Sequence, residues 1–430
     1  MILKSDGTLG ATLASESLQL TDTLINGAGG CRSRTQILLR DLQSSYREED
    51  TRCCESKYFS RQSRLPCTYI NGNDIVFGTG AKVSDGISSV SGVTGKRTSV
   101  VETLGASLIC TDYARISGTG TDVIPLDADL SSMTLEEGYD FAMCRILGCV
   151  LPESSERTPD PSVNILGYGI TDLGWEYGLE ELRGLFSSMG VRVLCAPGCM
   201  PSEDEVMDSR NAWLNVMIHP EMCGDTAGMY RERFDIPGLR PESGAPVGYR
   251  ATRSLLVQVA DSLGVDPGPA LEMIDMDESK VIRMLNCYNK GVNMLRWRYF
   301  SMEASSSELY PLMRWMHDVF AMVPDSIIPT DAEYLPEIAS YLESIGKSDC
   351  LMSPIRRVND IVFTDGIECS YGRAEGGVTS YVEVRLPGIR GLNLVGRCMV
   401  GTVGCRYILD EMLNGIVRFR CGQPTSVDMR

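Results

Sequence analysis

Two cysteines stand where apolar runs end, and their side chains could bind a soft metal. Cys31 closes a glycine-rich stretch that starts at Asn26, directly after the apolar run 23–25. Cys110 ends a second apolar run, which starts at Ala106. If both runs are buried strands of an α/β sheet, both thiols lie at the sheet edge where such folds build their sites. Thiolates from two strands at one edge favour a shared soft metal, such as the iron of an iron–sulfur cluster.

Cys67 and Asp6 are the other candidate ligands in the first part of the chain. Pro66 favours extended backbone before it, so we expect Cys67 on exposed backbone rather than inside a helix. Asp6 offers a harder oxygen ligand that can still bind iron. It also stands where the N-cap of a helix near Gly10 is expected. An unliganded role stays open for all these candidates, with the cysteines as small residues in turns.

The composition is that of a globular protein rather than a nucleic-acid or membrane binder. The chain has 430 residues, of which 43% are hydrophobic and 23% charged, and its length suggests about three domains. The formal net charge of −17 argues against a nucleic-acid surface and against anionic membrane. No apolar run approaches the roughly 20 residues of a spanning helix, and the start lacks a secretory pattern. We expect a cytoplasmic protein whose 16 cysteines are mostly small buried side chains rather than disulfides.

Strand and helix patterns alternate along the chain and divide it into three α/β segments. We expect these at residues 1–158, 162–285 and 286–430, with a linker at 152–161. The crossovers are long enough for parallel pairing, so the predicted fold is α/β with three doubly wound Rossmann-like domains on parallel sheets. The predicted strands are 23–26, 74–77, 107–110, 122–126, 163–169 with its turn, 191–195, 296–302, 361–364 and 380–386, with a further apolar element at 211–219. The predicted helices are 10–20, 33–45, 137–149, 179–189, 307–319 and 407–417.

A series of short motifs resembles the catalytic component of nitrogenase and of nitrogenase-like reductases, and most of all its β-type chains. The motifs are Asp6–Ala11, Gly27–Cys31, Asn73–Gly78 with Lys82, the run ending at Cys110, Asn211–Asn215, Leu386-Pro387 and Gly401–Gly404. Each is weak alone, but together they occur in order over nearly the whole chain. That family holds a bridging iron–sulfur cluster between two chains through three cysteines per chain. The resemblance maps the second onto Cys31 and the third onto Cys110, while Asp6 stands in place of the first, which favours a four-iron (4Fe-4S) over an eight-iron (8Fe-7S) cluster.

The resemblance implies a subunit of an oligomeric oxidoreductase. Its partners would be a second catalytic chain, either α-type or a second copy of itself, and a separate ATP-dependent iron–sulfur reductase. ATP would act only through that reductase, because Gly95-Lys96 is followed by Arg97 and lacks the upstream glycine of a P-loop. Electrons would pass through the interface cluster to a substrate or cofactor in an interdomain cleft. The alternative is a scaffold that assembles a metal–sulfur cofactor without turnover, and dinitrogen, a tetrapyrrole and a thioether stay open as substrates.

Three side chains are candidate proton donors in such a cleft: His219, Tyr168 and Tyr113. His219 ends an apolar run, and the resemblance sets it where the α-type chain has a cysteine that anchors the large metal cofactor. The α-type cofactor histidine has no counterpart here, since its place falls near Val400. Cofactor ligation of that kind is therefore not expected, and a plain pocket or capping role is the alternative for His219.

Overall fold

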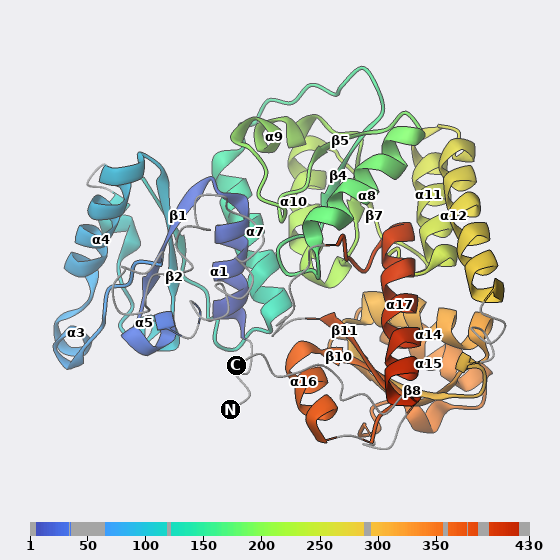
Figure 1. The fold of residues 1–430 in the computed structure, drawn as a ribbon. Helices are drawn as coiled ribbons and strands as arrows, with labels where there is room; N and C mark the ends of the chain where they lie inside the picture. The colour runs from blue at the N-terminus through green and yellow to red at the C-terminus, as the bar shows by residue number, and fades with distance from the viewer. Residues whose placement is uncertain are drawn as a thin grey trace.

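The computed structural model contains three parallel sheets, which confirms the predicted α/β fold class (Figure 1). We call each sheet with its helices the first, second and third domain. The predicted helix 33–45, apart from residues 33 and 35, and the Leu386-Pro387 motif lie outside the described residues. The structure describes residues 6–33, 35, 65–117, 122–287, 294–355, 360–375, 377–385 and 395–420.

The first domain carries the cysteines on a sheet of order β1-β2-β3. The strands are β1 (Thr21–Asn26), β2 (Arg97–Glu102) and β3 (Val123–Leu126). The helices are α1 (Gly7–Leu18), α3 (Gly72–Phe77), α4 (Gly80–Thr94), α5 (Leu104–Ser107), α6 (Tyr113–Ser117) and α7 (Leu135–Val150). Helices α1 and α7 cover one face of the sheet and α4 covers the other (Figure 1).

Two predicted strands of the first segment are wrong. Residues 74–77 belong to α3, residue 107 ends the short helix α5, and residues 108–110 follow that helix without forming a strand. The strand that precedes Cys110 is β2, which the sequence patterns did not reveal. Short apolar runs do not by themselves distinguish strand from helix, and here the apolar side chains of Phe77 and Leu108 are exposed instead of lining a core.

Helices α1 and α7 pack with their backbones in close approach (Figure 1). A Cβ atom added at Gly138 would lie 2.3 Å from the Cα of Gly7, and one added at Gly10 would lie 2.0 Å from the carbonyl oxygen of Leu135. Only glycine fits at these positions without moving a helix. The contact holds α7 against the first domain, so α7 can act as the bridge to the second.

The second domain has a parallel sheet of order β5-β4-β6-β7. Its strands are β4 (Ser162–Leu166), β5 (Arg192–Cys195), β6 (Leu214–Met217) and β7 (Gly238–Leu239). Its helices are α8 (Trp175–Ser188), α9 (Glu203–Asp208), η2 (Ser209–Asn211), η3 (Pro220–Met222), α10 (Gly224–Phe234), α11 (Tyr249–Leu263) and α12 (Gly268–Cys287). The predicted strands at 163 and 191 and the predicted helix 179–189 are confirmed.

The third domain has a parallel sheet of order β11-β10-β8-β9. Its strands are β8 (Tyr299–Ala304), β9 (Val323–Pro329), β10 (Ile361–Asp365) and β11 (Ser380–Arg385). Its helices are α14 (Ser306–Phe320), α15 (Leu335–Ser344), η4 (Ser348–Cys350), α16 (Gly366–Glu375) and α17 (Gly401–Arg420). The strands and helices predicted for this segment are confirmed, while the exact domain boundaries stay a prediction.

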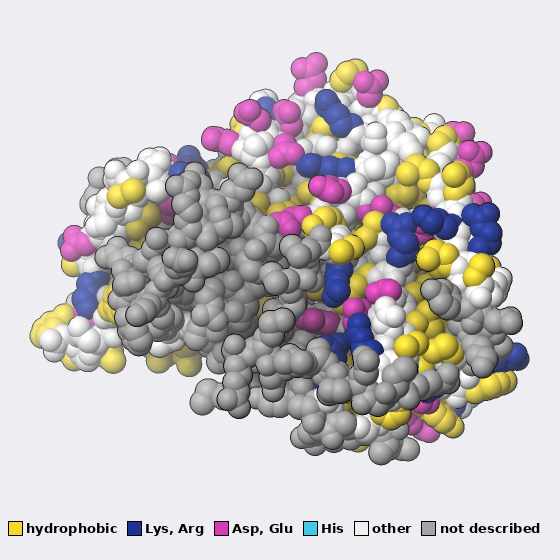
Figure 2. All heavy atoms as spheres, in the orientation of Figure 1, with side chains coloured by type: hydrophobic (Ala, Val, Ile, Leu, Met, Phe, Trp, Pro, Cys, Tyr) yellow, Lys and Arg dark blue, Asp and Glu magenta, His cyan; other side chains and the backbone are white. Residues whose placement is uncertain are grey.

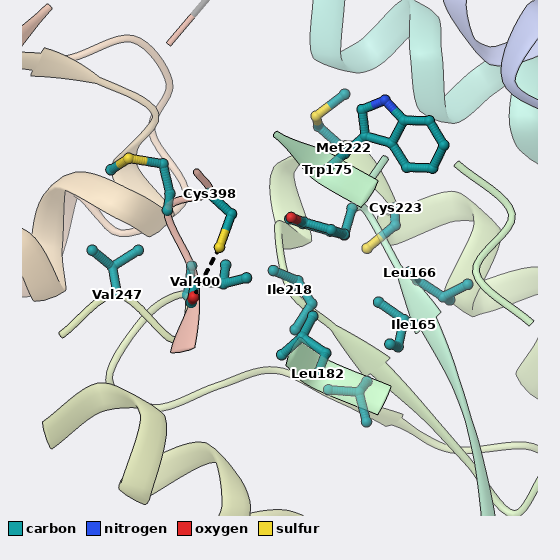
Figure 3. Close-up of a cluster of buried hydrophobic side chains, with 14 of the residues drawn as sticks. Ile165, Leu166, Trp175, Leu182, Ile218, Met222, Cys223, Val247, Cys398 and Val400 are labelled. Carbon is teal, nitrogen blue, oxygen red and sulfur yellow. Dashed lines mark hydrogen bonds between the residues drawn. The ribbon is translucent and has the colours of Figure 1, made fainter. Parts of the chain in front are cut away.

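One hydrophobic core runs from the second domain into the third. Figure 3 shows Ile218 of the second domain facing Val400 and Cys398, which precede α17, and all three belong to one core cluster with Ile165 and Val247. The thiol of Cys398 donates to the carbonyl oxygen of Val400 at 3.3 Å. Helix α17 then packs on β11 and also on α8 and α11. None of the helices in the described residues is both long and apolar enough to cross a bilayer.

Candidate metal centre

Cys67 lies beside the end of β1 because its segment pairs with that strand. The Ile25 N–H donates to the Pro66 carbonyl at 2.9 Å, and the Thr68 N–H donates to the Ile25 carbonyl at 3.0 Å. These bonds form an isolated parallel bridge between Ile25 and Cys67. The chain therefore returns to the carboxyl edge of the first sheet, where the glycine-rich turn carries Cys31.

Cys31 is a neighbour of the Cys67 thiol and influences its charge. The Cys67 thiol donates to the Gly27 carbonyl at 3.1 Å and accepts from the Tyr69 N–H at 3.4 Å. Burial raises the pKa of Cys67 to about 11, the Arg32 guanidinium opposes the rise, and the neighbouring Cys31 adds to it. A metal ion would favour the thiolate instead, because cations stabilise the deprotonated ligand.

Cys110 reaches the same edge from β2. The Thr103 N–H and hydroxyl both donate to the Asn26 carbonyl at 3.1 Å, which ties the segment after β2 to the end of β1. Cys110 itself is exposed and has a left-handed backbone, with φ of 53°. This conformation costs a non-glycine residue roughly 1–2 kcal/mol. Such strain is concentrated at functional sites, which makes Cys110 a stronger candidate than a cysteine in a relaxed turn.

Helix α4 connects the segments that carry Cys67 and Cys110. The Lys82 ammonium donates to the Tyr69 carbonyl at 3.3 Å and to Asp74 at 2.7 Å. At the start of α4, the hydroxyls of Thr79 and Thr111 lie 2.6 Å apart. Both cysteine segments are thus fixed to one rigid element.

A buried network of polar side chains joins the ends of β1 and β2. The sequence analysis missed most of this network. Glu102, at the end of β2, accepts from the Tyr113 hydroxyl at 2.6 Å and from the Asn26 side chain at 3.4 Å. Asn26 in turn accepts from the Thr68 hydroxyl at 2.9 Å. Tyr113, expected as a proton donor, is therefore engaged in positioning. Polar side chains that end apolar strands, as Asn26 and Glu102 do, were the available signal.

Asp6 caps α1, which confirms the structural alternative for this residue. It has extended backbone, and its carboxylate accepts from the Leu9 N–H at 3.2 Å. A ligand role for Asp6 stays a prediction. His219 and Tyr168 lie elsewhere, buried at the junction of the second and third domains.

We call the end of the first sheet near Cys31, Cys67 and Cys110 the cysteine edge. An apolar surface lies next to it. We use the name apolar surface for Tyr69, Ile75, Val76, Phe77, Leu104 and Leu108, all of which are exposed. Phe77 is 85% exposed and Leu108 is 78% exposed, and Figure 2 shows the yellow side chains at the left tip, over α3. Contiguous exposed apolar side chains mark interaction sites. The thiols of Cys31 and Cys110 are also exposed, so a partner covering this surface could complete their coordination.

The donor set fits an iron–sulfur cluster. Cys31, Cys67 and Cys110 would offer soft sulfur ligands near this edge of the first sheet, which suits iron bound with sulfide. A cluster of this type usually takes four protein ligands. The remaining ligand would come from Asp6 or from another chain.

Comparisons with known proteins show which proteins the chain resembles. A subunit of light-independent protochlorophyllide reductase from Prosthecochloris aestuarii is 34% identical over 127 residues, which cover 28% of this chain and 23% of that protein. The same subunit from Rhodospirillum rubrum is 35% identical over 173 residues, covering 37% and 30%. The chain thus matches less than a third of the length of either relative.

The fold extends to solved nitrogenase structures. The structure "Nitrogenase Cp1 at pH 6.5" has a TM-score of 0.77 and 14% identity, covering 99% of this chain and 95% of that chain. At this identity the likeness concerns the fold alone. The family model for nitrogenase component 1 type oxidoreductases matches residues 7–319. Because this match covers well over half of the sequence, the chain belongs to the nitrogenase component 1 type oxidoreductase family.

Proposed function

We propose that this chain is a subunit of a nitrogenase-like oxidoreductase that shares a four-iron cluster with a second catalytic chain. The proposal rests on hydrogen bonds that tie the segments carrying Cys31, Cys67 and Cys110 to the same end of the first sheet, beside an exposed apolar surface. The second chain is α-type or a second copy. Free thiols and a labile cluster suit a reducing compartment, so we place the protein in the cytoplasm.

Each group at the edge has a role in this proposal. The thiols of Cys31, Cys67 and Cys110 would bind the iron of the cluster. The hydrogen bonds among Glu102, Tyr113 and Asn26 hold the ends of β1 and β2 in register. The apolar surface excludes water once a partner covers it. When bound, the cluster would supply one-electron transfer from an ATP-dependent iron–sulfur reductase to a substrate in an interdomain cleft. The relatives are named for light-independent reduction of protochlorophyllide, which makes a tetrapyrrole the first substrate to test.

Serine substitutions of the three cysteines test the ligand set. We expect Cys31→Ser, Cys67→Ser and Cys110→Ser each to lower the iron and sulfide content of anaerobically purified protein by about half or more, because an alcohol is a poor iron ligand. The matched control is Cys149→Ser, an exposed cysteine on α7. Iron and acid-labile sulfide analysis, with electron paramagnetic resonance of the reduced protein, provides the measurement.

The same iron assay tells whether Asp6 is a helix cap or an iron ligand. It also helps to distinguish an oxidoreductase subunit from an assembly scaffold. Asn caps helices as well as Asp does, so Asp6→Asn should retain its iron if Asp6 only caps α1 and lose iron if it is a ligand. Unchanged iron in all three serine variants would refute the ligand assignment. Wild-type protein that holds iron, transfers it to an apo acceptor and reduces no substrate with the reductase present would favour the scaffold.

A further inference from the structure

A second group of potential ligands lies buried at the junction of the second and third domains, away from the cysteine edge. Asp172 comes from the loop between β4 and α8, His219 follows β6, and Glu308 lies in the first turn of α14. One ligand atom from each of these residues lies within 4.8 Å of the other two. Two domains therefore deliver an imidazole and two carboxylates to one point.

The hydrogen bonds around His219 indicate which ring nitrogen could bind a metal. Nδ1 lies 2.7 Å from the Ser307 hydroxyl, and that hydroxyl donates its hydrogen to Glu221 at 2.6 Å. The Ser307 oxygen must then accept from Nδ1–H, which leaves the neutral imidazole with its lone pair on Nε2. Metal-binding histidines are oriented in the same way, by a hydrogen bond from the other ring nitrogen.

Nε2 faces Asp172. It lies 2.8 Å from Asp172 Oδ1, yet it has no aligned hydrogen-bond acceptor, although the side chain is only 3% exposed. The other oxygen of Asp172 is engaged, because it accepts from the Gly169 N–H at 2.7 Å. Two atoms that carry lone pairs lie this close only with a proton or a metal cation to hold them. A metal ion accepts electron density from both, without the alignment that a hydrogen bond needs.

The negative charge of the carboxylates around His219 also favours a bound cation. Asp172, Glu221 and Glu308 are all largely buried, and within the described ranges the ion pairs of Asp172 and Glu221 are made with His219 alone. Buried carboxylates without paired charge are costly. A divalent cation would compensate this charge.

The backbone after β4 approaches the backbone of His219 closely. Gly167 has φ of 76°, and a Cβ atom there would lie 2.3 Å from the His219 carbonyl oxygen. The Tyr168 ring stacks on the imidazole, with centroids 6.2 Å apart and an interplanar angle of 21°. These contacts fix the ring plane.

We propose that Asp172, His219 and Glu308 form a binding site for one divalent first-row transition-metal ion. The donor set contains no sulfur, so the site is separate in chemistry and place from the cysteine edge. One imidazole with two carboxylates suits Zn²⁺, Fe²⁺ or Mn²⁺, and affinity should rise from Mn²⁺ to Zn²⁺. The bound ion would link the loops of the second domain to α14 of the third.

Manganese is the probe of choice, because the 16 cysteines of the chain would capture Zn²⁺ whereas Mn²⁺ prefers oxygen and nitrogen ligands. The chelator-treated full chain is titrated with Mn²⁺ while the electron paramagnetic resonance of the free ion is followed. Pulsed measurements then report nitrogen coupling to the bound ion. We expect one Mn²⁺ per chain with ¹⁴N coupling. His219→Gln should abolish that coupling, and both His219→Gln and Glu308→Gln should weaken binding by about tenfold or more.

The chain offers a matched control in its other histidine. His317 lies on the same helix as Glu308, and its Nδ1 lies 2.8 Å from the Tyr341 hydroxyl. His317→Gln should leave Mn²⁺ affinity and ¹⁴N coupling unchanged. Absence of Mn²⁺ binding by folded wild type would overturn the site and leave a protonated charge network, and so would binding without ¹⁴N coupling. If His219→Gln fails to fold, Glu308→Gln decides, because Mn²⁺ should then raise the melting temperature of wild type but not of this variant.

Discussion

At the residue scale, Glu102 shows how a buried carboxyl group can position a site without touching a ligand. Its carboxylate receives the hydroxyl hydrogen of Tyr113 and an amide hydrogen of Asn26, and it is 5% exposed. Burial raises the pKa of Glu102, and the two hydrogen bonds oppose that rise. The sequence allowed Tyr113 to be singled out because tyrosine is a known proton donor. It could not show that Glu102 engages this hydroxyl, since the pair meets only after β2 and α6 pack.

The raised pKa of Glu102 predicts a pH-dependent effect of Glu102→Gln. The folded chain holds this proton at pH values where the unfolded chain, in which a glutamate has its ordinary pKa of 4.5, has lost it. The contribution of Glu102 to stability is therefore full below 4.5 and falls as pH rises through the folded pKa. We expect the melting-temperature difference, wild type minus Glu102→Gln, to decrease from about pH 5 to about pH 8. The control is Glu232→Gln at an exposed position, and a difference that grows with pH would contradict the prediction.

At the element scale, strands were predicted more accurately where their residues are buried. In the second and third domains, strands such as β4 and β10 consist of fully buried residues, and these were predicted within a few positions. In the first domain, the apolar runs ending at Phe77 and Cys110 resemble strands although they lie on the apolar surface. A single sequence does not say whether an apolar run faces a core or a partner. The failures therefore fall on the surface for which a partner is proposed.

Helix α7 connects the first domain to the second through a buried cap. Asp140 of α7 accepts from the Asp225 N–H at 2.6 Å, from the Thr226 N–H at 3.0 Å and from the Thr226 hydroxyl at 2.6 Å. These donors belong to the first turn of α10. The carboxylate satisfies amides that a helix start leaves unpaired and carries the charge that the helix dipole favours there.

Loss of this cap should destabilise the chain and loosen the two domains. We expect Asp140→Ala to lower the free energy of unfolding by about 1–3 kcal/mol, because it leaves buried donors unpaired. Urea unfolding measures the loss, and cleavage within the 152–161 linker by limited proteolysis should accelerate. Thr226→Val removes only the hydroxyl bond and should cost less. If Asp140→Ala stayed within about 0.5 kcal/mol of wild type, as surface substitutions do, the cap would not join the domains.

At the scale of the whole molecule, side chains from distant segments meet where no local pattern announces them. The family resemblance identified Cys31 and Cys110 as candidates, although the strand before Cys110 was misplaced. Of the three proposed metal ligands at the junction of the second and third domains, the sequence analysis singled out only His219. Asp172 and Glu308 were not singled out, because their proximity depends on how the second and third domains pack.

The apolar surface provides the last prediction, which links assembly to iron. A stable interface buries roughly 1,000 Å² or more, and a charge introduced at its centre is costly to bury. We expect Phe77→Glu combined with Leu108→Glu to abolish association with a second chain, measured by sedimentation velocity of the anaerobic protein. The control is Val93→Glu, which alters a side chain that is 86% exposed near the far end of α4.

The iron content of the same samples decides whether the cluster is shared. The double variant keeps every proposed ligand, so it should lose iron only if a second chain completes the coordination. Iron and association should therefore fall together in Phe77→Glu/Leu108→Glu and both persist in Val93→Glu. Retention of full iron by a variant that sediments as a monomer would show that one chain holds the cluster alone. Unchanged association would instead move the interface away from α3 and the segment after α5, because a glutamate at each position could not be buried there without a compensating partner charge.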